Sequence, residues 1–211
     1  LDPENRKEKE VEIKTINLSI DAAEKGGYDY FMAKEIYEQP KAVKDTVSPL
    51  IKNGKIQLPF EFPNNFIKNL NRIYIVACGS AYHVGVTAKY IIEDMVRVPV
   101  MVDIASEFRY RNPIIGKGDL CIFVSQSGET ADTLASLREA KARGAFTMSI
   151  VNVLFSTIAR ESDGVIYTNA GAEIAVATTK AFSAQLSVAY ILSAYMAHKK
   201  GLLSDIELKA F

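Results

Sequence analysis

The most constraining feature of this chain is a series of short apolar runs in which polar residues do not alternate. The runs cover residues 73–78, 98–102, 120–124, 146–151 and 164–167. Strands of this kind are buried on both faces, and the stretches between them are long enough to form helices. The pattern therefore predicts an α/β fold with a five-stranded, mainly parallel sheet, covered on both faces and joined by right-handed crossovers.

The chain before residue 66 has a different character. Residues 11–16 alternate apolar and polar side chains, which is typical of a half-buried strand. A helix is expected to end before Pro40, and a second helix over residues 41–51 is expected to be interrupted at Ser48 and Pro49. We divide the chain into a linker, a helical arm with its connection, and a sheet domain, at residues 1–20, 21–65 and 66–211.

The composition excludes several classes of function. Formal net charge is zero and no basic block is present, so nucleic-acid and anionic-membrane partners are not expected. The longest apolar tract, residues 186–197, is too short to span a bilayer. His83 and His198 are isolated, so no metal site or cofactor is expected. Cys78 and Cys121 both lie in apolar runs and are expected to be buried, reduced thiols in the cytoplasm.

A polar turn follows the apolar run at 120–124 and precedes a helical pattern. Ser125, Ser127 and Thr130 supply hydroxyls, Gln126 supplies an amide, and Gly128 allows close backbone approach. One interpretation is a pocket for the phosphate of a small ligand, because a helix N-terminus attracts anions. The other is an ordinary helix cap.

Two further strands of the predicted sheet also end in small polar residues. They end at residues 78–81 and 168–171. Ligands of open parallel sheets collect beyond the carboxyl ends of strands, so the coincidence favours a binding site over capping.

Several blocks of sequence resemble the sugar isomerase (SIS) domain family. The blocks are residues 77–83, 105–111, 125–133 and 173–182, in that order, and residues 34–40 resemble a lead-in helix. Within the family, they are most similar to the first SIS half of the isomerizing glutamine–fructose-6-phosphate aminotransferases, the glucosamine-6-phosphate synthases. The resemblance extends over about residues 26–200.

The resemblance implies a three-layer α/β/α fold and a homodimeric cytoplasmic enzyme of amino-sugar biosynthesis. Such enzymes convert fructose 6-phosphate and glutamine to glucosamine 6-phosphate, using an N-terminal glutaminase domain and two SIS halves. Residues 1–20 would then be a linker remnant from the glutaminase domain. The implied substrate-binding residues are Ser125, Gln126, Ser127 and Thr130 at the phosphate, Val176, Ala177 and Thr178 along the sugar, and Ser80 with Ala81 at the first strand.

The same resemblance assigns no catalytic residue to this chain. The family's cysteine nucleophile, proton-carrying glutamate and Schiff-base lysine belong to segments that this sequence does not include. Sugar-phosphate binding with little or no turnover is therefore expected. Lys180 is expected to be solvated or paired with an acid, Glu173 to hold Lys180 or a loop amide, and His83 to make a local hydrogen bond. Ala81 and Thr178 depart from the family's usual serines at those positions.

Two alternatives remain open at this point. The chain could be a non-catalytic phosphosugar sensor, although residues 1–65 lack the basic recognition helix of a DNA-binding domain. It could also be a related SIS deglycase or isomerase, against which the blocks at 34–40 and 107–111 argue. The apolar residues of the arm at 28–51 have little of their own to pack on, so self-association is expected.

Overall fold

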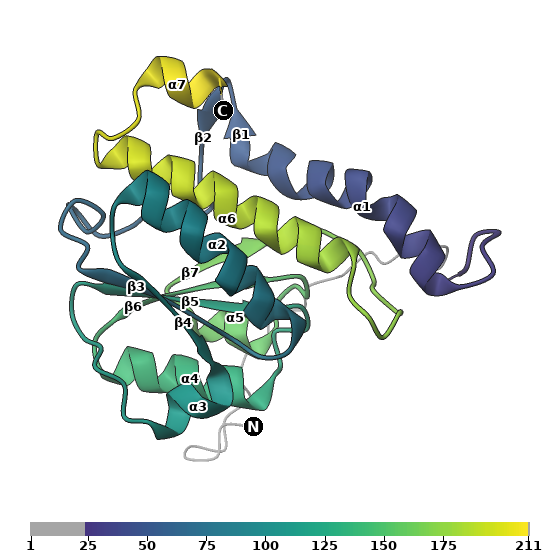
Figure 1. Ribbon diagram of the computed structural model, residues 1–211, viewed down its shortest axis with the longest axis horizontal. Helices are drawn as coiled ribbons and strands as arrows, with labels where there is room; N and C mark the ends of the chain where they lie inside the picture. The colour runs from purple at the N-terminus through teal and green to yellow at the C-terminus, as the bar shows by residue number, and fades with distance from the viewer. Residues whose placement is uncertain (1–23, 211) are drawn as a thin grey trace, which may run out of the picture.

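The structure is a computed structural model and describes residues 24–210. Its central sheet has the order β4-β3-β5-β6-β7, and every neighbouring pair is parallel (Figure 1). The strands are β3 (Arg72–Ala77), β4 (Val100–Ile104), β5 (Asp119–Ser125), β6 (Phe146–Val151) and β7 (Gly164–Tyr167). The five-stranded parallel sheet predicted from the apolar runs is thereby confirmed.

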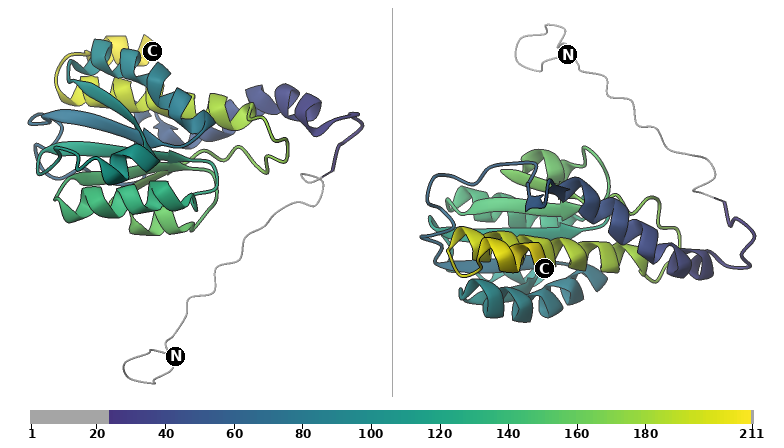
Figure 2. Two further views of the ribbon diagram at one scale, coloured as in Figure 1. Left: turned by 60° about the horizontal axis from the view of Figure 1, so that its bottom comes forward. Right: turned by 90° about the horizontal axis from the view of Figure 1, so that it is seen from above.

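Helices cover both faces of this sheet, as Figures 1 and 2 show. One face carries α2 (Ser80–Val96) and α6 (Lys180–Lys199), and the other carries α3 (Ala105–Tyr110), α4 (Ala131–Ala142) and α5 (Thr157–Glu161). Alternate residues of each strand enter opposite cores, so that Ile73 and Ile75 pack under α2 while Tyr74 and Val76 face α3 and α4. Both sides of each strand are apolar for this reason, and the three-layer α/β/α fold is confirmed.

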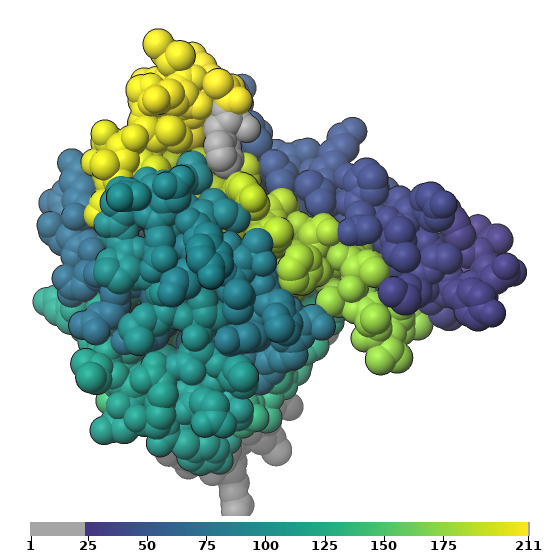
Figure 3. All heavy atoms as spheres, viewed as in Figure 1, coloured from purple at the N-terminus to yellow at the C-terminus, as the bar shows by residue number. Residues whose placement is uncertain are grey.

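The arm is a single helix, α1 (Phe31–Val47), which runs through Pro40. The prediction that a helix ends before Pro40 was therefore wrong. Pro40 has no N–H for the carbonyl of Ile36, but the side-chain amide of Gln39 donates to that carbonyl at 3.1 Å. Packing of α1 along α6 supplies the remaining stabilisation, and Figure 3 shows α1 (purple) lying against α6 (yellow-green).

The connection after α1 contains more regular structure than the sequence predicts. A 3-10 turn, η2 (Ser48–Leu50), takes the place of the continuation to residue 51. A small antiparallel hairpin follows, with β1 (Ile51–Lys52) and β2 (Lys55–Ile56) joined by Asn53 and Gly54. Both turn residues have positive φ, 53° and 69°, which is the conformation of a type I′ hairpin turn. The Asn-Gly pair is the signal that was overlooked.

The remaining elements complete the described chain. A short helix, α7 (Asp205–Ala210), follows α6. The strand predicted over residues 11–16 lies outside the described residues. Within the described part of the chain, none of the helices combines the length and apolar character needed to cross a membrane.

The sheet order places a topological switch beside β3. The chain passes from β3 to β4 on one side and then returns to β5 on the other side of β3. The two crossovers diverge at this point, so the carboxyl ends of β3 and β5 are left uncovered between them. Ligand sites of open parallel sheets form at such positions.

Candidate functional site

A pocket of about 200 Å³ lies at the switch point between β3 and β5. Its walls come from the ends of both strands, from the loop that precedes α6, and from α6 itself. The lining residues are Cys78, Ser80, Ala81, Val124, Ser125, Gln126, Ser127, Thr130, Glu173, Thr178 and Gln185. A larger hollow of about 520 Å³ beside Phe66 and Tyr195 contains none of these residues.

The N-termini of three helices meet at this pocket. Ser80 is the first residue of α2, Thr130 is the N-cap of α4, and Thr178 stands two residues before the start of α6. The N-termini of α2 and α4 present unpaired N–H groups and the positive end of a helix dipole, whereas the N–H groups of Thr179 and Ala181 at the start of α6 bond the Glu173 carboxylate. The pocket wall includes neither lysine nor arginine, so the attraction for an anion comes from these dipoles and from the hydroxyls.

The hydroxyls of the loop at residues 125–130 do not cap α4. The Oγ of Ser125 accepts the N–H of Gly128 at 3.0 Å and lies 3.1 Å from the Oγ1 of Thr130. Ser127 Oγ accepts the N–H of Glu129 at 3.2 Å. Thr130 makes no side-chain cap, and in the described structure no other side chain does so. These hydroxyls therefore do not cap α4, and Ser125 and Ser127 instead bond N–H groups within the loop.

This loop is fixed by the segment between β6 and α5. The N–H of Asn152 donates to the Gln126 carbonyl at 3.1 Å, and the N–H of Ile158 donates to the Gly128 carbonyl at 3.0 Å. The Glu129 carboxylate accepts the N–H of Thr157 at 2.6 Å, and hydrogen bonding by Thr157 lowers the pKa of Glu129 below its ordinary value. The backbone of the loop is thus held in place by residues 152–158.

The opposite wall of the pocket is organised by Glu173. Its carboxylate accepts the Thr178 hydroxyl at 3.0 Å, the Thr179 N–H at 3.0 Å and the Ala181 N–H at 3.2 Å. Glu173 thus holds loop amides, one of the two structural roles expected for it, and it closes residues 173–181 into a compact turn.

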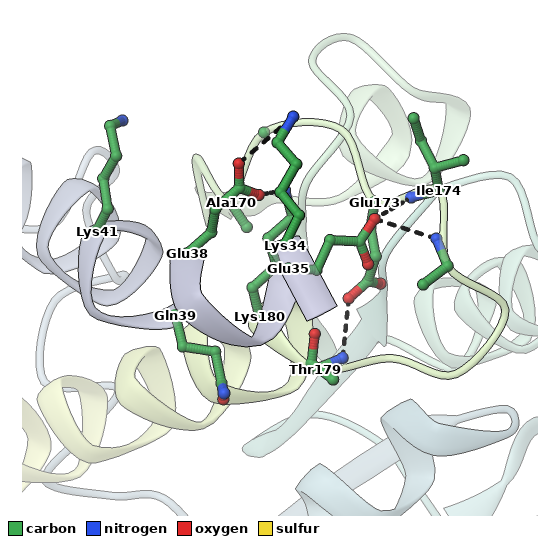
Figure 4. A network of polar contacts seen from close by, with 12 residues as sticks. Lys34, Glu35, Glu38, Gln39, Lys41, Ala170, Glu173, Ile174, Thr179 and Lys180 are labelled. Atoms are coloured by element: carbon green, nitrogen blue, oxygen red, sulfur yellow. Dashed lines mark hydrogen bonds and ion pairs between the residues drawn. The ribbon is translucent and has the colours of Figure 1, made fainter. Parts of the chain in front are cut away.

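Lys180 is buried, with 4% of its surface exposed, and its Nζ lies 2.7 Å from the Oε2 of Glu38 on α1 (Figure 4). The expectation that Lys180 pairs with an acid is confirmed. The partner stands far away in the sequence, so only the folded structure identifies it. His83 is exposed on α2, outside the pocket, with its ring 5.5 Å from that of Tyr82.

Most of the predicted binding residues share one pocket. Ser80, Ala81, Ser125, Gln126, Ser127, Thr130 and Thr178 all line it. Val176 and Ala177 are exposed in the same loop as Thr178 but do not line the pocket, so their contact with a sugar stays a prediction.

Four lining residues were not among the predicted binding residues: Cys78, Glu173 and two more residues from apolar stretches. The latter two are Val124, at the end of β5, and Gln185, which is 2% exposed on α6. The sequence did contain a signal for Gln185, which is a polar residue within a mostly apolar helical pattern.

The two cysteines lie in different environments. Cys121 is buried inside β5, and burial raises the pKa of its thiol. Cys78 is only half-buried and lines the pocket, because β3 ends one residue earlier. The prediction that both thiols are buried was wrong for Cys78. Across residues 24–210, no cluster of three or more histidine, cysteine or acidic side chains is arranged to hold a metal ion.

Known proteins with similar sequences include glutamine–fructose-6-phosphate aminotransferases (isomerizing) from several bacteria. The chain is 56% identical over 205 residues to the glutamine–fructose-6-phosphate aminotransferase (isomerizing) of Clostridium tetani, covering 96% of this chain and 34% of that protein. The chain therefore spans about a third of the length of this curated relative.

Solved structures agree with the sequence matches. The C-terminal domain of the glucosamine-fructose-6-phosphate aminotransferase of Francisella tularensis superposes with a TM-score of 0.83 and 45% identity, covering 89% of this chain and 53% of that one. The glucosamine-6-phosphate deaminase of Thermotoga maritima gives a TM-score of 0.65 at 25% identity, covering 80% and 49%. The SIS domain model matches residues 66–194, which is more than half of the sequence. With the pocket at the switch point of its sheet, this chain belongs to the SIS domain family.

Proposed function

We propose that this chain is the phosphosugar-binding half of the isomerase region of a glutamine–fructose-6-phosphate aminotransferase. Its pocket would take fructose 6-phosphate and glucosamine 6-phosphate. The observation that carries the proposal is the meeting of two helix N-termini, those of α2 and α4, with the hydroxyls of Ser80, Ser125, Ser127 and Thr130. The 56% identity to a relative of that name supports the choice of reaction.

The physical basis of binding is neutral hydrogen bonding to a charged ligand. Ser127 is exposed, and among the described residues no acceptor takes the N–H of Ser127. A phosphate oxygen at this point would receive charge-assisted hydrogen bonds, which are about twice as strong as neutral ones. The opposite wall, formed by residues 173–181 around Glu173, would then face the carbons and hydroxyls of the sugar.

The pocket itself would bind and orient the sugar. Isomerisation requires a base that moves a proton between adjacent carbons. The Glu173 carboxylate is already occupied by a hydroxyl and two backbone N–H groups, so it is poorly suited to that task. We therefore assign proton transfer to residues that do not line this pocket, and expect little or no turnover from this chain alone.

The test is isothermal titration of this chain with glucosamine 6-phosphate. Replacing Ser127 with alanine is expected to weaken binding by about 1–3 kcal/mol, because the lost hydroxyl meets a charged oxygen. This corresponds to roughly a 5- to 150-fold rise in Kd. Ser162→Ala, whose hydroxyl bonds the Ile158 carbonyl at the end of α5, is the control and is expected to bind normally. An absence of binding by the parent chain, or equal affinity of parent and Ser127→Ala, would contradict the proposal.

We also propose that the chain self-associates through α1 and acts in the cytoplasm. Tyr37 on this helix and Tyr30 just before it are each 73% exposed, and Met32 and Ile36 are also exposed. Large apolar groups gathered on one helix are typical of protein–protein interfaces. The two cysteines are free thiols, which persist in a reducing compartment. Sedimentation that showed only monomers at high concentration would contradict the association.

A further inference from the structure

The sequence block at residues 34–40 lies outside the region that the SIS model matches, yet its side chains reach the pocket loop. The block forms the middle of α1, which lies along α6 (Figures 2 and 3). Figure 4 shows the side chain of Glu35 directed at Ile174, in the loop that contains Glu173, and the side chain of Glu38 directed at Lys180 and Lys34. A helix that the domain model does not include therefore contributes contacts beside the pocket.

Glu35 makes the most direct of these contacts. The residue is 2% exposed, and its Oε1 accepts the N–H groups of Ile174 and Ala175 at 2.6 and 3.0 Å. Its Oε2 is buried and has no hydrogen-bond partner among the described residues. A buried carboxylate with one unpaired oxygen destabilises a fold unless its other contacts compensate. Here the hydrogen bonds from the N–H groups of Ile174 and Ala175 compensate for the unpaired oxygen, and they fix the backbone of the loop.

Two more residues of α1 hold the other end of the same loop. Glu38 pairs with Lys180 at 2.7 Å, and the Ser183 hydroxyl donates to Gln39 Oε1 at 2.6 Å. The helix thus contacts residues 174–175 in the loop and residues 180–183 at the start of α6. Thr178, which lines the pocket, lies between these two attachments.

The phosphate loop has no comparable dependence on α1. Residues 126–129 are fixed by the segment at 152–158, which belongs to the sheet domain. Among the described residues, α1 bonds the wall at residues 173–181 and not the phosphate loop, while Asn152 bonds both the Gln126 carbonyl and the backbone of Ala170 and Gly171. A substitution in α1 can therefore disturb the wall at residues 173–181 while the hydrogen bonds that fix residues 126–129 remain.

We propose that Glu35 is a positioning residue for the sugar-facing wall of the pocket and that α1 is part of the binding site. This inference rests on the proposed function, because it assigns the sugar rather than the phosphate to residues 173–179. Glu35 acts through the backbone at Ile174 and Ala175, which sets where Thr178 and Glu173 lie. A helix outside the region that the SIS domain model matches thus determines how the sugar is held.

The first experiment needs no ligand. Hydrogen–deuterium exchange at the amides of Ile174 and Ala175 is expected to be faster in Glu35→Ala than in the parent chain, because both N–H groups lose their acceptor. Glu35→Gln keeps a neutral acceptor, so its exchange is expected to be intermediate. Asp45→Asn alters an exposed charge on the same helix and is expected to leave both amides unchanged. Unchanged exchange in a folded Glu35→Ala or Glu35→Gln protein would overturn the proposal.

The second experiment separates the two walls. Glucosamine 6-phosphate is expected to bind Glu35→Ala about tenfold or more weakly than the parent, since a displaced wall loses sugar contacts. Inorganic phosphate, followed by NMR titration, is expected to bind both proteins equally. Equal binding of glucosamine 6-phosphate by a parent and a Glu35→Ala protein would overturn the proposal while the proposed function stands. A parent chain that binds neither compound would overturn the proposed function, and with it the sugar role of Glu35. Should Glu35→Ala fail to fold by circular dichroism, Glu35→Gln serves in both experiments.

Discussion

Gly128 is the residue at which the geometry of the phosphate loop is most restrictive. Its φ is +65°, and a Cβ built on it would lie 2.0 Å from the Oγ of Ser156 and 2.5 Å from the Ser156 Cβ. The left-handed conformation and the close approach both require glycine. The loop therefore packs directly on the start of α5, and this contact holds the hydroxyls of Ser125 and Ser127 toward the pocket.

Replacing Gly128 with alanine is expected to destabilise the chain strongly. Gly201 provides a matched control, because its φ is +75° but nothing lies within 4 Å of an added Cβ. Gly201→Ala is expected to cost about 1–2 kcal/mol for the backbone conformation alone. Gly128→Ala is expected to cost about 1–3 kcal/mol more, from the clash with Ser156. Urea unfolding measures both, and equal losses in the two variants would show that the clash is relieved without cost.

At the scale of secondary-structure elements, α1 is unusual because it contains a proline in its interior. Pro40 is exposed in the middle of the helix, and the Gln39 side chain satisfies the Ile36 carbonyl that the proline leaves unpaired. On its opposite side the helix buries Ala42 and Thr46, and the Thr46 hydroxyl bonds the Thr168 carbonyl at the end of β7. Tertiary contacts thus maintain a helix that local preferences would interrupt.

Replacing Pro40 with alanine is expected to stabilise the chain by about 1–2 kcal/mol. The new N–H can bond the Ile36 carbonyl, and the helix propensity improves, while the unfolded chain gains some freedom. The free energy of unfolding in urea measures the change. Lys44→Ala on the same helix is the control and is expected to remain within about 0.5 kcal/mol of the parent. A loss of stability in Pro40→Ala would show that packing on α6 depends on the proline ring.

At the scale of the whole molecule, Asp163 ties together elements that meet at one end of the sheet. Its Oδ2 accepts both the N–H and the hydroxyl of Thr147 on β6, at 2.9 and 2.7 Å. Its Oδ1 lies 2.9 Å from the Nζ of Lys141 on α4. Partial burial acts to raise the pKa of Asp163, but the hydrogen bonds from Lys141 and Thr147 outweigh it, and the pKa falls below the ordinary value of 3.8.

This shift predicts how the stability of the molecule depends on pH. A carboxyl whose pKa is lower in the folded state stabilises the fold at neutral pH and loses that contribution as pH falls through 3.8 and then through the folded value. Asp163→Asn is therefore expected to be less stable than the parent at neutral pH, with the difference shrinking in acid. Thermal unfolding across pH measures it. Asp94→Asn, an exposed carboxyl, is the control, and a difference that grew in acid would contradict the assignment.

Much of this protein was determined by the sequence alone. Apolar runs without alternation specify strands buried on both faces, because each position in such a strand must find an apolar neighbour, and a parallel sheet between helices follows. The hydroxyl-rich turn at Ser125–Ser127–Thr130 was also visible, since an abrupt change from a buried apolar run to small polar residues marks the end of a strand. The helix through Pro40 was not visible, because contacts with α6 outweigh a local preference against it.

Only the tertiary structure decided what surrounds the site. Glu35 and Glu38 reach Ile174 and Lys180 across well over a hundred residues of sequence, and no local pattern encodes such a meeting. The same holds for the three helix N-termini, whose convergence depends on the order of strands in the sheet. Propensities and periodicities act over a few residues, whereas the charges that shape this pocket become neighbours only when the layers pack.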